Sequence, residues 1–145
     1  MKVELILDPS CGEPEVTVRT AARTAEVEDL LRRLEEGPAG ILGFREDRAV
    51  PLIPGSVLRF YGEDKGVLAQ TEDGVWRVRL RLYELEERLE RHTFVRISQS
   101  EIVNLRKVTA LDLALTGTIR MTLTGGTVCW VSRRYVKKIK EALGL

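Results

Sequence analysis

The spacing of apolar residues along the chain predicts a mainly β protein with a few short helices. Apolar and polar residues alternate in several short runs; in 119–123, for example, every second residue is apolar, which is the period of a half-buried strand. Strands are expected at 2–7, 15–19, 41–44, 48–53, 57–61, 66–71, 75–80, 94–97, 108–115, 119–123 and 127–131. Asp73-Gly74 and Gly125-Gly126 fit the tight turns of β-hairpins.

Three segments have the apolar stripe of an amphipathic helix. The first is predicted to begin after Thr24, a residue type that favours the N-cap, and to end at Gly37-Pro38. The second covers 82–90, and the third is capped by Ser132 and continues toward the C-terminus. Because strands outnumber helices, the expected fold class is mainly β with short helices (α+β).

A turn at Pro54-Gly55 is the predicted boundary between two parts of the chain. Residues 1–55 are expected to form a small N-terminal α/β module with a dimerisation or regulatory role, and residues 56–145 a larger, mostly β domain. A piece of about 55 residues buries little surface and is only marginally stable alone. We therefore expect the module to pack on the larger domain or on a second copy of itself.

The charge of the chain is unevenly distributed. Residues 1–56 contain 7 basic and 11 acidic side chains, whereas residues 57–145 contain 16 basic and 11 acidic ones. The basic second part predicts a polyanionic partner. Since no run of about 18 apolar residues occurs and the N-terminal apolar run is broken by charges, we expect no membrane insertion, no signal peptide and a cytoplasmic location.

Few residues of this chain suit catalysis or metal binding. His92 is the single histidine; it follows a charged helical segment and is expected at the surface. Cys11 and Cys129 lie far apart and are expected to be reduced thiols, and with His92 they are one ligand short of a structural zinc site. Glycine-rich phosphate-binding motifs are missing as well. We therefore expect no enzyme activity, no metal and no cofactor.

Two polar segments contain groups that suit nucleic-acid binding. One follows a predicted strand and the other begins the last helix; together they contain Arg96, Ser98, Gln99, Ser132, Arg133, Arg134 and Lys137. The free amides of a helix N-terminus attract phosphate, and nearby arginines reach phosphates or the edge of a guanine. The alternative interpretation is an ordinary capped helix with a basic surface.

Five motifs in 56–145 then occur together in one order. They are Leu82-Tyr-Glu-Leu-Glu-Glu-Arg-Leu89, Phe94-Val-Arg-Ile-Ser-Gln-Ser100, Ile102-Val-Asn-Leu105, Gly125-Gly126 and Val131-Ser-Arg-Arg-Tyr135. With this set the chain resembles the LytTR-type DNA-binding domains, and its short N-terminal region resembles the stand-alone transcriptional regulators of that family. The resemblance implies an elongated stack of small antiparallel sheets whose loops enter successive major grooves of duplex DNA.

The resemblance also assigns DNA contacts to individual residues. The base-reading arginine near the start of the last helix falls on Arg134. The polar position after the Phe-x-Arg strand falls on Gln99, where the family more often has asparagine. A third contact, from the first hairpin loop, falls near Lys65.

Other residues of these motifs are expected to have structural roles. Asn104 is expected to brace the turn after its strand, and Tyr135 and Trp130 to pack or to frame the surface. Glu101 would repel phosphate and is expected to orient an arginine instead. Arg96 suits either a phosphate contact or a local ion pair.

Together these features predict a bacterial transcription regulator that binds double-stranded DNA at specific sequences. We expect a homodimer on repeated promoter half-sites, with residues 1–55 as a surface for a protein partner. One alternative is an RNA-binding module, although the few aromatic residues are not clustered as in sheet-surface RNA readers. Another is a protein-interaction or ligand-sensing domain whose basic face is incidental.

Overall fold

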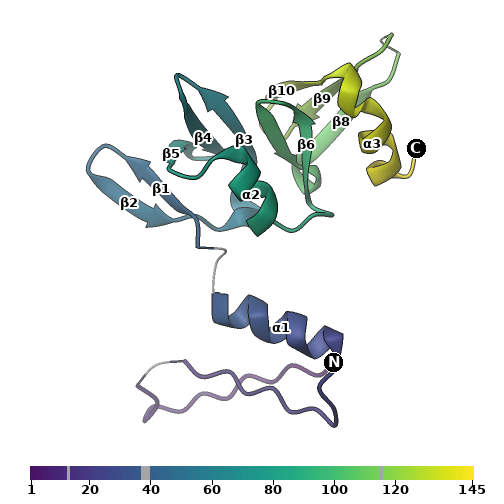
Figure 1. Cartoon of the computed structure of the whole chain (residues 1–145). Helices are drawn as coiled ribbons and strands as arrows, with labels where there is room; N and C mark the ends of the chain where they lie inside the picture. The colour runs from purple at the N-terminus through teal and green to yellow at the C-terminus, as the bar shows by residue number, and fades with distance from the viewer. Residues whose placement is uncertain (13, 37–39, 115) are drawn as a thin grey trace. The chain divides into compact units, whose positions relative to one another are not determined.

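The computed structural model describes residues 1–12, 14–36, 40–114 and 116–145. Contacts divide the chain into two compact units, Met1–Glu35 and Glu36–Leu145, which we call unit 1 and unit 2. Figure 1 shows the helices and strands of both units, and most of the regular structure lies in unit 2. The mainly β, antiparallel architecture predicted from the sequence is confirmed.

Unit 1 contains one helix, α1 (Ala25–Glu36). Thr24 caps it as predicted, because the Thr24 hydroxyl accepts a hydrogen bond from the Val27 amide at 3.3 Å. The predicted end of this helix at Gly37-Pro38 lies outside the described residues. The strands predicted at 2–7 and 15–19 are wrong: the described residues of unit 1 form extended segments without ladder pairing. An alternating apolar pattern becomes a strand only where a neighbouring strand accepts its hydrogen bonds.

The boundary between the units differs from the one predicted at residue 55. Strands β1 (Leu42–Arg45) and β2 (Arg48–Pro51) pair with each other, and β1 also pairs with β5 (Gly74–Val78) of the main sheet. The flanking Ile41 and Leu52 are buried in the core of unit 2. The predicted turn at Pro54-Gly55 is a single 3-10 turn, Pro54–Ser56, that leads directly into β3 within unit 2.

Unit 2 contains two antiparallel sheets. The larger has the strand order β2-β1-β5-β4-β3-β7-β6, and the smaller has the order β10-β9-β8. Their remaining strands are β3 (Val57–Glu63), β4 (Gly66–Thr71), β6 (Phe94–Ser98), β7 (Glu101–Asn104), β8 (Val108–Asp112), β9 (Ile119–Leu123) and β10 (Val128–Val131). Sequence reasoning missed β7, because its three consecutive buried residues show no alternation.

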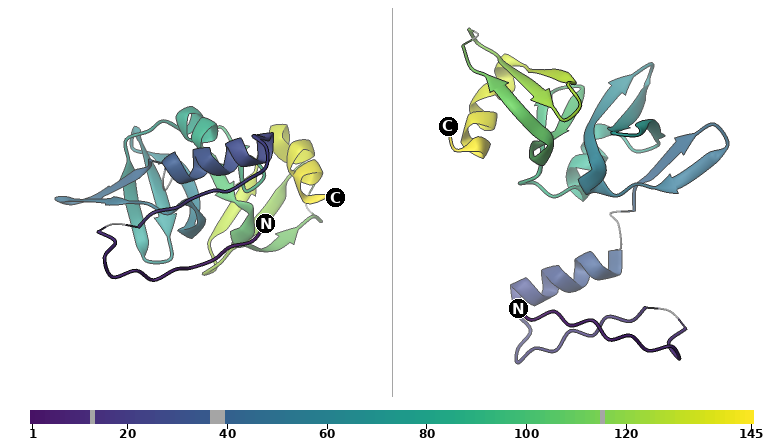
Figure 2. Two further views of the ribbon diagram at one scale, coloured as in Figure 1. Left: turned by 90° about the horizontal axis from the view of Figure 1, so that it is seen from below. Right: turned by 180° about the vertical axis from the view of Figure 1, so that it is seen from behind.

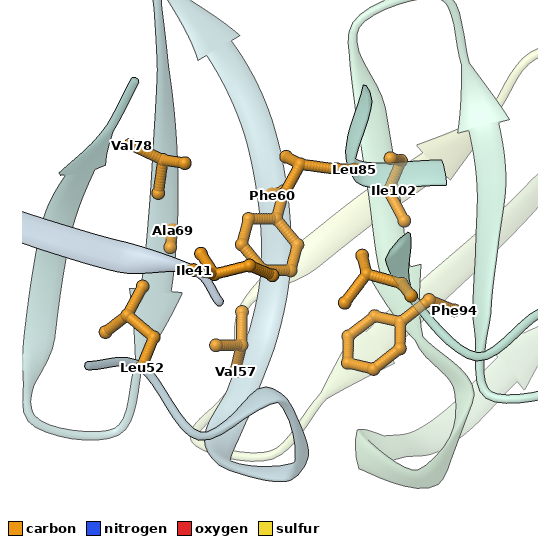
Figure 3. Close-up of a cluster of buried hydrophobic side chains, with 10 residues drawn as sticks. Ile41, Leu52, Val57, Phe60, Ala69, Val78, Leu85, Phe94 and Ile102 are labelled. Carbon is orange, nitrogen blue, oxygen red and sulfur yellow. The ribbon is translucent and has the colours of Figure 1, made fainter. Parts of the chain in front are cut away.

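The larger sheet has a hydrophobic core on each face. On one face, helix α2 (Leu82–Arg88) packs on the sheet through Leu85, and Phe60 lies within this first core (Figure 3). On the other face, Leu58 and its neighbours pack against the smaller sheet and helix α3 (Arg133–Leu143), which lie side by side in Figure 2. Val57 and Phe60 enter the first core and Leu58 enters the second, and the β3–β4 register shifts between Val57 and Arg59. Strand β3 therefore contributes to both cores.

Asn104 braces the end of β7 as predicted, and it is the buried polar side chain of the core. Its amide donates a 2.9 Å hydrogen bond to the Val57 carbonyl, and its oxygen accepts a 3.0 Å bond from the Arg106 amide. The side chain thus satisfies backbone groups on two segments far apart in sequence.

Candidate nucleic-acid interface

Three of the predicted DNA-contacting segments meet at one edge of unit 2, which we call the turn edge. It consists of the β3–β4 hairpin 63–66, the β6–β7 turn 98–101 and the start of α3. The Gly62 amide donates to the Ser100 carbonyl at 2.9 Å, which joins the hairpin to the turn. The Ser132 amide donates to the Ile97 carbonyl at 2.9 Å, which joins the start of α3 to β6. The hairpin and the start of α3 both point to the upper side of unit 2 in Figure 1.

Lys65 lies at the tip of the hairpin. Glu63 pairs with Gly66, so Asp64 and Lys65 are the two loop residues. Both have positive φ values, 48° and 65°, which is the conformation of a type I′ turn. The Lys65 side chain is exposed, and the tight turn fixes the position from which it extends.

Gln99 lies at the tip of the β6–β7 turn and is exposed. Arg96 braces this turn from below: its guanidinium donates to the Ser98 carbonyl at 2.9 Å and to the Gln99 carbonyl at 2.5 Å. It also forms an ion pair with Glu86 of α2. The structure therefore has Arg96 in the local ion pair, one of the two roles expected for it.

The Ser98 hydroxyl accepts a 3.2 Å hydrogen bond from the Ser100 amide. This bond closes the turn that carries Gln99.

The start of α3 presents basic side chains and backbone amides. Ser132 holds the N-cap position, but within the described structure its hydroxyl makes no cap hydrogen bond. The Tyr135 amide donates to the Ser132 carbonyl at 2.9 Å, so the Arg133 and Arg134 amides are the ones placed to bind an anion. Arg134 is exposed. Arg133 lies over the β8–β9 loop, since a Cβ on Gly117 would be 3.0 Å from its Nε, and Lys137 lines the same groove one turn later.

A polar cluster at the seam between the two sheets supports the turn edge. Arg59 donates to Gln70 at 2.7 Å and to the Glu101 carboxylate at 2.8 Å, and its guanidinium lies 4.1 Å from the centre of the Tyr61 ring. Gln70 donates in turn to Thr127, at 2.8 Å, next to the smaller sheet. Sequence reasoning expected Glu101 to orient an arginine, which is confirmed, but did not identify Arg59 as that arginine or Gln70 as its second partner.

Both partners of the ion pair are largely buried, with side chains 20% and 15% exposed for Arg59 and Glu101. Burial alone would lower the pKa of Arg59, but the hydrogen bond and the charge of Glu101 raise it above its ordinary value. The Arg59 guanidinium therefore stays charged near neutral pH. Because Glu101 is the last residue of the β6–β7 turn, the pair fixes that turn against β3.

Comparison with known proteins identifies the family. The family model of the LytTr DNA-binding domain matches residues 47–144. The chain belongs to the LytTR family. A LytTr DNA-binding domain from Bacillus cereus has a similar fold, with a TM-score of 0.70 at 23% identity over 72% of this chain and 97% of that one.

Full-length relatives of this LytTR protein occur in Staphylococcus aureus. Uncharacterized HTH-type transcriptional regulators from strains NCTC 8325 and COL are each 31% identical to it, over 100% of this chain and 99% of theirs. Their name refers to a helix-turn-helix. In the described part of this LytTR chain, however, α2 and α3 are separated by five strands and do not form such a pair.

Two further predictions for the LytTR chain can be compared with the structure. His92 is exposed, as expected. Cys129 is buried in the second core, and burial, followed by its hydrogen bond with Glu101, raises the pKa of the thiol to about 12. The thiol is thus protonated at neutral pH and a poor nucleophile.

Trp130 is 53% exposed and frames the surface, whereas Tyr135 packs against the second core. No described helix is both long and apolar enough to cross a membrane.

Proposed function

We propose that this protein regulates transcription by binding duplex DNA at specific sequences, with the turn edge facing the major groove. The observation that carries the proposal is that backbone hydrogen bonds join the segments that contain Lys65, Gln99 and Arg134 within unit 2. An arginine suits a guanine edge and a glutamine amide suits an adenine edge. Lys65 adds an exposed cation from the neighbouring hairpin, and a lysine also suits the acceptors of a guanine edge.

The remaining polar residues of the edge suit contacts to phosphate, which position a protein on DNA without reading its sequence. We assign this role to Ser98, Ser132, Arg133 and Lys137. Arg96 acts through the β6–β7 turn that it braces. Regulation then follows from occupancy of promoter DNA in the bacterial cytoplasm, without a cofactor or a chemical reaction.

Titration of a labelled duplex over a salt series tests the proposal. Since neutralised phosphates release counterions, the logarithm of the association constant should fall linearly with the logarithm of the salt concentration. Duplex RNA of the same length serves as the competitor. Weak binding that does not depend on salt, or a preference for RNA, would contradict duplex DNA binding through the basic face of unit 2.

Replacing Lys137 with alanine should weaken binding evenly across DNA sequences and lower the salt slope by about one. The reason is that Lys137 is exposed on the groove side of α3 and is assigned to a phosphate. The measurement is the same salt titration with several unrelated duplexes. A loss confined to one sequence would contradict the assignment.

We further propose that unit 1 makes the protein a homodimer on repeated half-sites. Val3, Leu5 and Leu7 are 82–85% exposed, so the extended segment leaves a row of apolar side chains in water. A unit of this size buries too little surface to be stable alone. A second copy of the segment would cover these side chains, and a protein partner binding there is the alternative.

The double substitution Leu5→Lys and Leu7→Lys should therefore convert the dimer to a monomer. The expected result is a halved mass in sedimentation equilibrium, because the charges would have to be buried at the interface. Glu4→Lys is the matched control, since it adds the same positive charge next to Leu5 without removing an apolar side chain. A monomeric wild-type protein, or a dimer that survives the double substitution, would contradict dimerisation through unit 1.

A further inference from the structure

The β3–β4 hairpin is acidic when considered alone. Glu63 and Asp64 carry two negative charges beside the single positive charge of Lys65, and all three side chains are exposed. A surface with this net negative charge repels phosphate. If Lys65 approaches DNA, other cations must lie close to the hairpin.

The next strand of the sheet supplies two. Strand β5 pairs with β4, with Val78 opposite Val67, so β5 runs back toward the tip of the hairpin. Arg77 lies in β5 and Arg79 directly follows its last residue, and both side chains are exposed. Adjacent strands are about 4.8 Å apart, so Arg77 lies one strand from β4 of the hairpin, and Arg79 follows the end of β5 that is level with the hairpin.

Both arginines are held by specific contacts. The Arg77 guanidinium lies over Gly66. A Cβ atom at residue 66 would be 2.5 Å from the Nη1 atom of Arg77, so the guanidinium occupies space that a side chain there would fill. We call this position the seat of Arg77. The Arg79 guanidinium lies 4.0 Å from the centre of the Phe44 ring on β1. Across the described part of the chain, neither arginine has a carboxylate within ion-pair distance.

We propose that Arg77 and Arg79 form a phosphate-binding site for duplex DNA that extends the interface outward from Lys65. The inference rests on the proposed function. With the two arginines, the net charge of the hairpin region becomes positive. The site would bind the backbone flanking the bases read by the Lys65 loop, so it contributes affinity and positioning rather than sequence preference.

Salt titration of a mixed-sequence duplex with the full chain tests the site. Arg77→Gln should weaken binding about fivefold at about 0.15 M salt and lower the salt slope by about one. Arg91→Gln is the matched control, because Arg91 is exposed before β6 at the opposite end of the sheet, and it should leave both quantities unchanged. If the Arg77 and Arg91 variants bind like the wild type, the site is overturned while duplex binding by the wild type still supports the proposed function.

Gly66→Ala tests the seat itself without changing any charge. The added methyl must displace the Arg77 guanidinium, so binding should weaken, and the same substitution in the Arg77→Gln background should cause no further loss. A further loss in that background would mean that residue 66 acts through the hairpin backbone, which contradicts the seat. Failure of the wild-type protein to bind duplex at all would overturn the proposed function together with this site.

Discussion

Replacing Arg134 with alanine is expected to weaken binding to the preferred duplex by about 1–3 kcal/mol, or about 5- to 150-fold. Arg134 is exposed in the first turn of α3, which the Ser132–Ile97 hydrogen bond anchors to β6. Its guanidinium matches the two acceptors of a guanine, so the loss should be largest for the duplex that has guanine at the contacted position.

Competition titrations with duplexes that differ at single base pairs measure this effect. The variant should bind the best and the substituted duplexes with similar affinity, which means that preference at one base pair is relaxed. Arg91→Ala removes an exposed arginine from the opposite end of the sheet and should leave the preference intact. Unchanged preference in a folded Arg134→Ala protein would show that another residue reads the base.

Replacing Phe60 with alanine is expected to reduce the free energy of unfolding by about 3–5 kcal/mol. Phe60 is fully buried in the first core, where its ring lies 6.0 Å from that of Phe94. The substitution removes these contacts and leaves a cavity that the flanking strands β4 and β7 cannot fill.

The loss should also affect DNA binding at elevated temperature, because β3 carries the Lys65 hairpin at its end. The loss of stability is measured by urea unfolding. The midpoint urea concentration should fall, while the slope of the unfolding free energy against urea concentration should stay the same. Tyr83→Ala is the matched control: Tyr83 is an aromatic residue that is 60% exposed, and its removal should cost no more than about 0.5 kcal/mol. If both substitutions reduced the free energy of unfolding equally, Phe60 would not be a major contributor to the first core.

The strands of unit 2 other than β7 could be predicted because local chemistry defines them. Asp73-Gly74 and Gly125-Gly126 mark turns, and the runs between such turns alternate. Gln99 and Arg134 were assigned through the resemblance to the LytTR family, and their predicted placement at a strand end and a helix start agrees with the structure. Whether they contact DNA stays a prediction.

The sequence alone did not indicate which strands and side chains far apart along the chain would pair. The pairing of β1 with β5 moves residues 36–55 into unit 2, and no local feature of β1 indicates that partner. The contact of Arg59 with Glu101 joins residues 42 positions apart. The seat of Arg77 on Gly66 likewise depends on the register of β4 and β5. A charge count of the 63–66 hairpin could have indicated that an extra cation was required there.

Selection of duplex DNA from a random pool by the purified full-length protein tests the central claim most directly. The account predicts enrichment of a motif repeated at a fixed spacing, with an affinity that falls as salt rises and a preference that Arg134→Ala relaxes. Recovery of a pool that remains random, together with weak binding insensitive to salt, would contradict sequence-specific recognition by the turn edge.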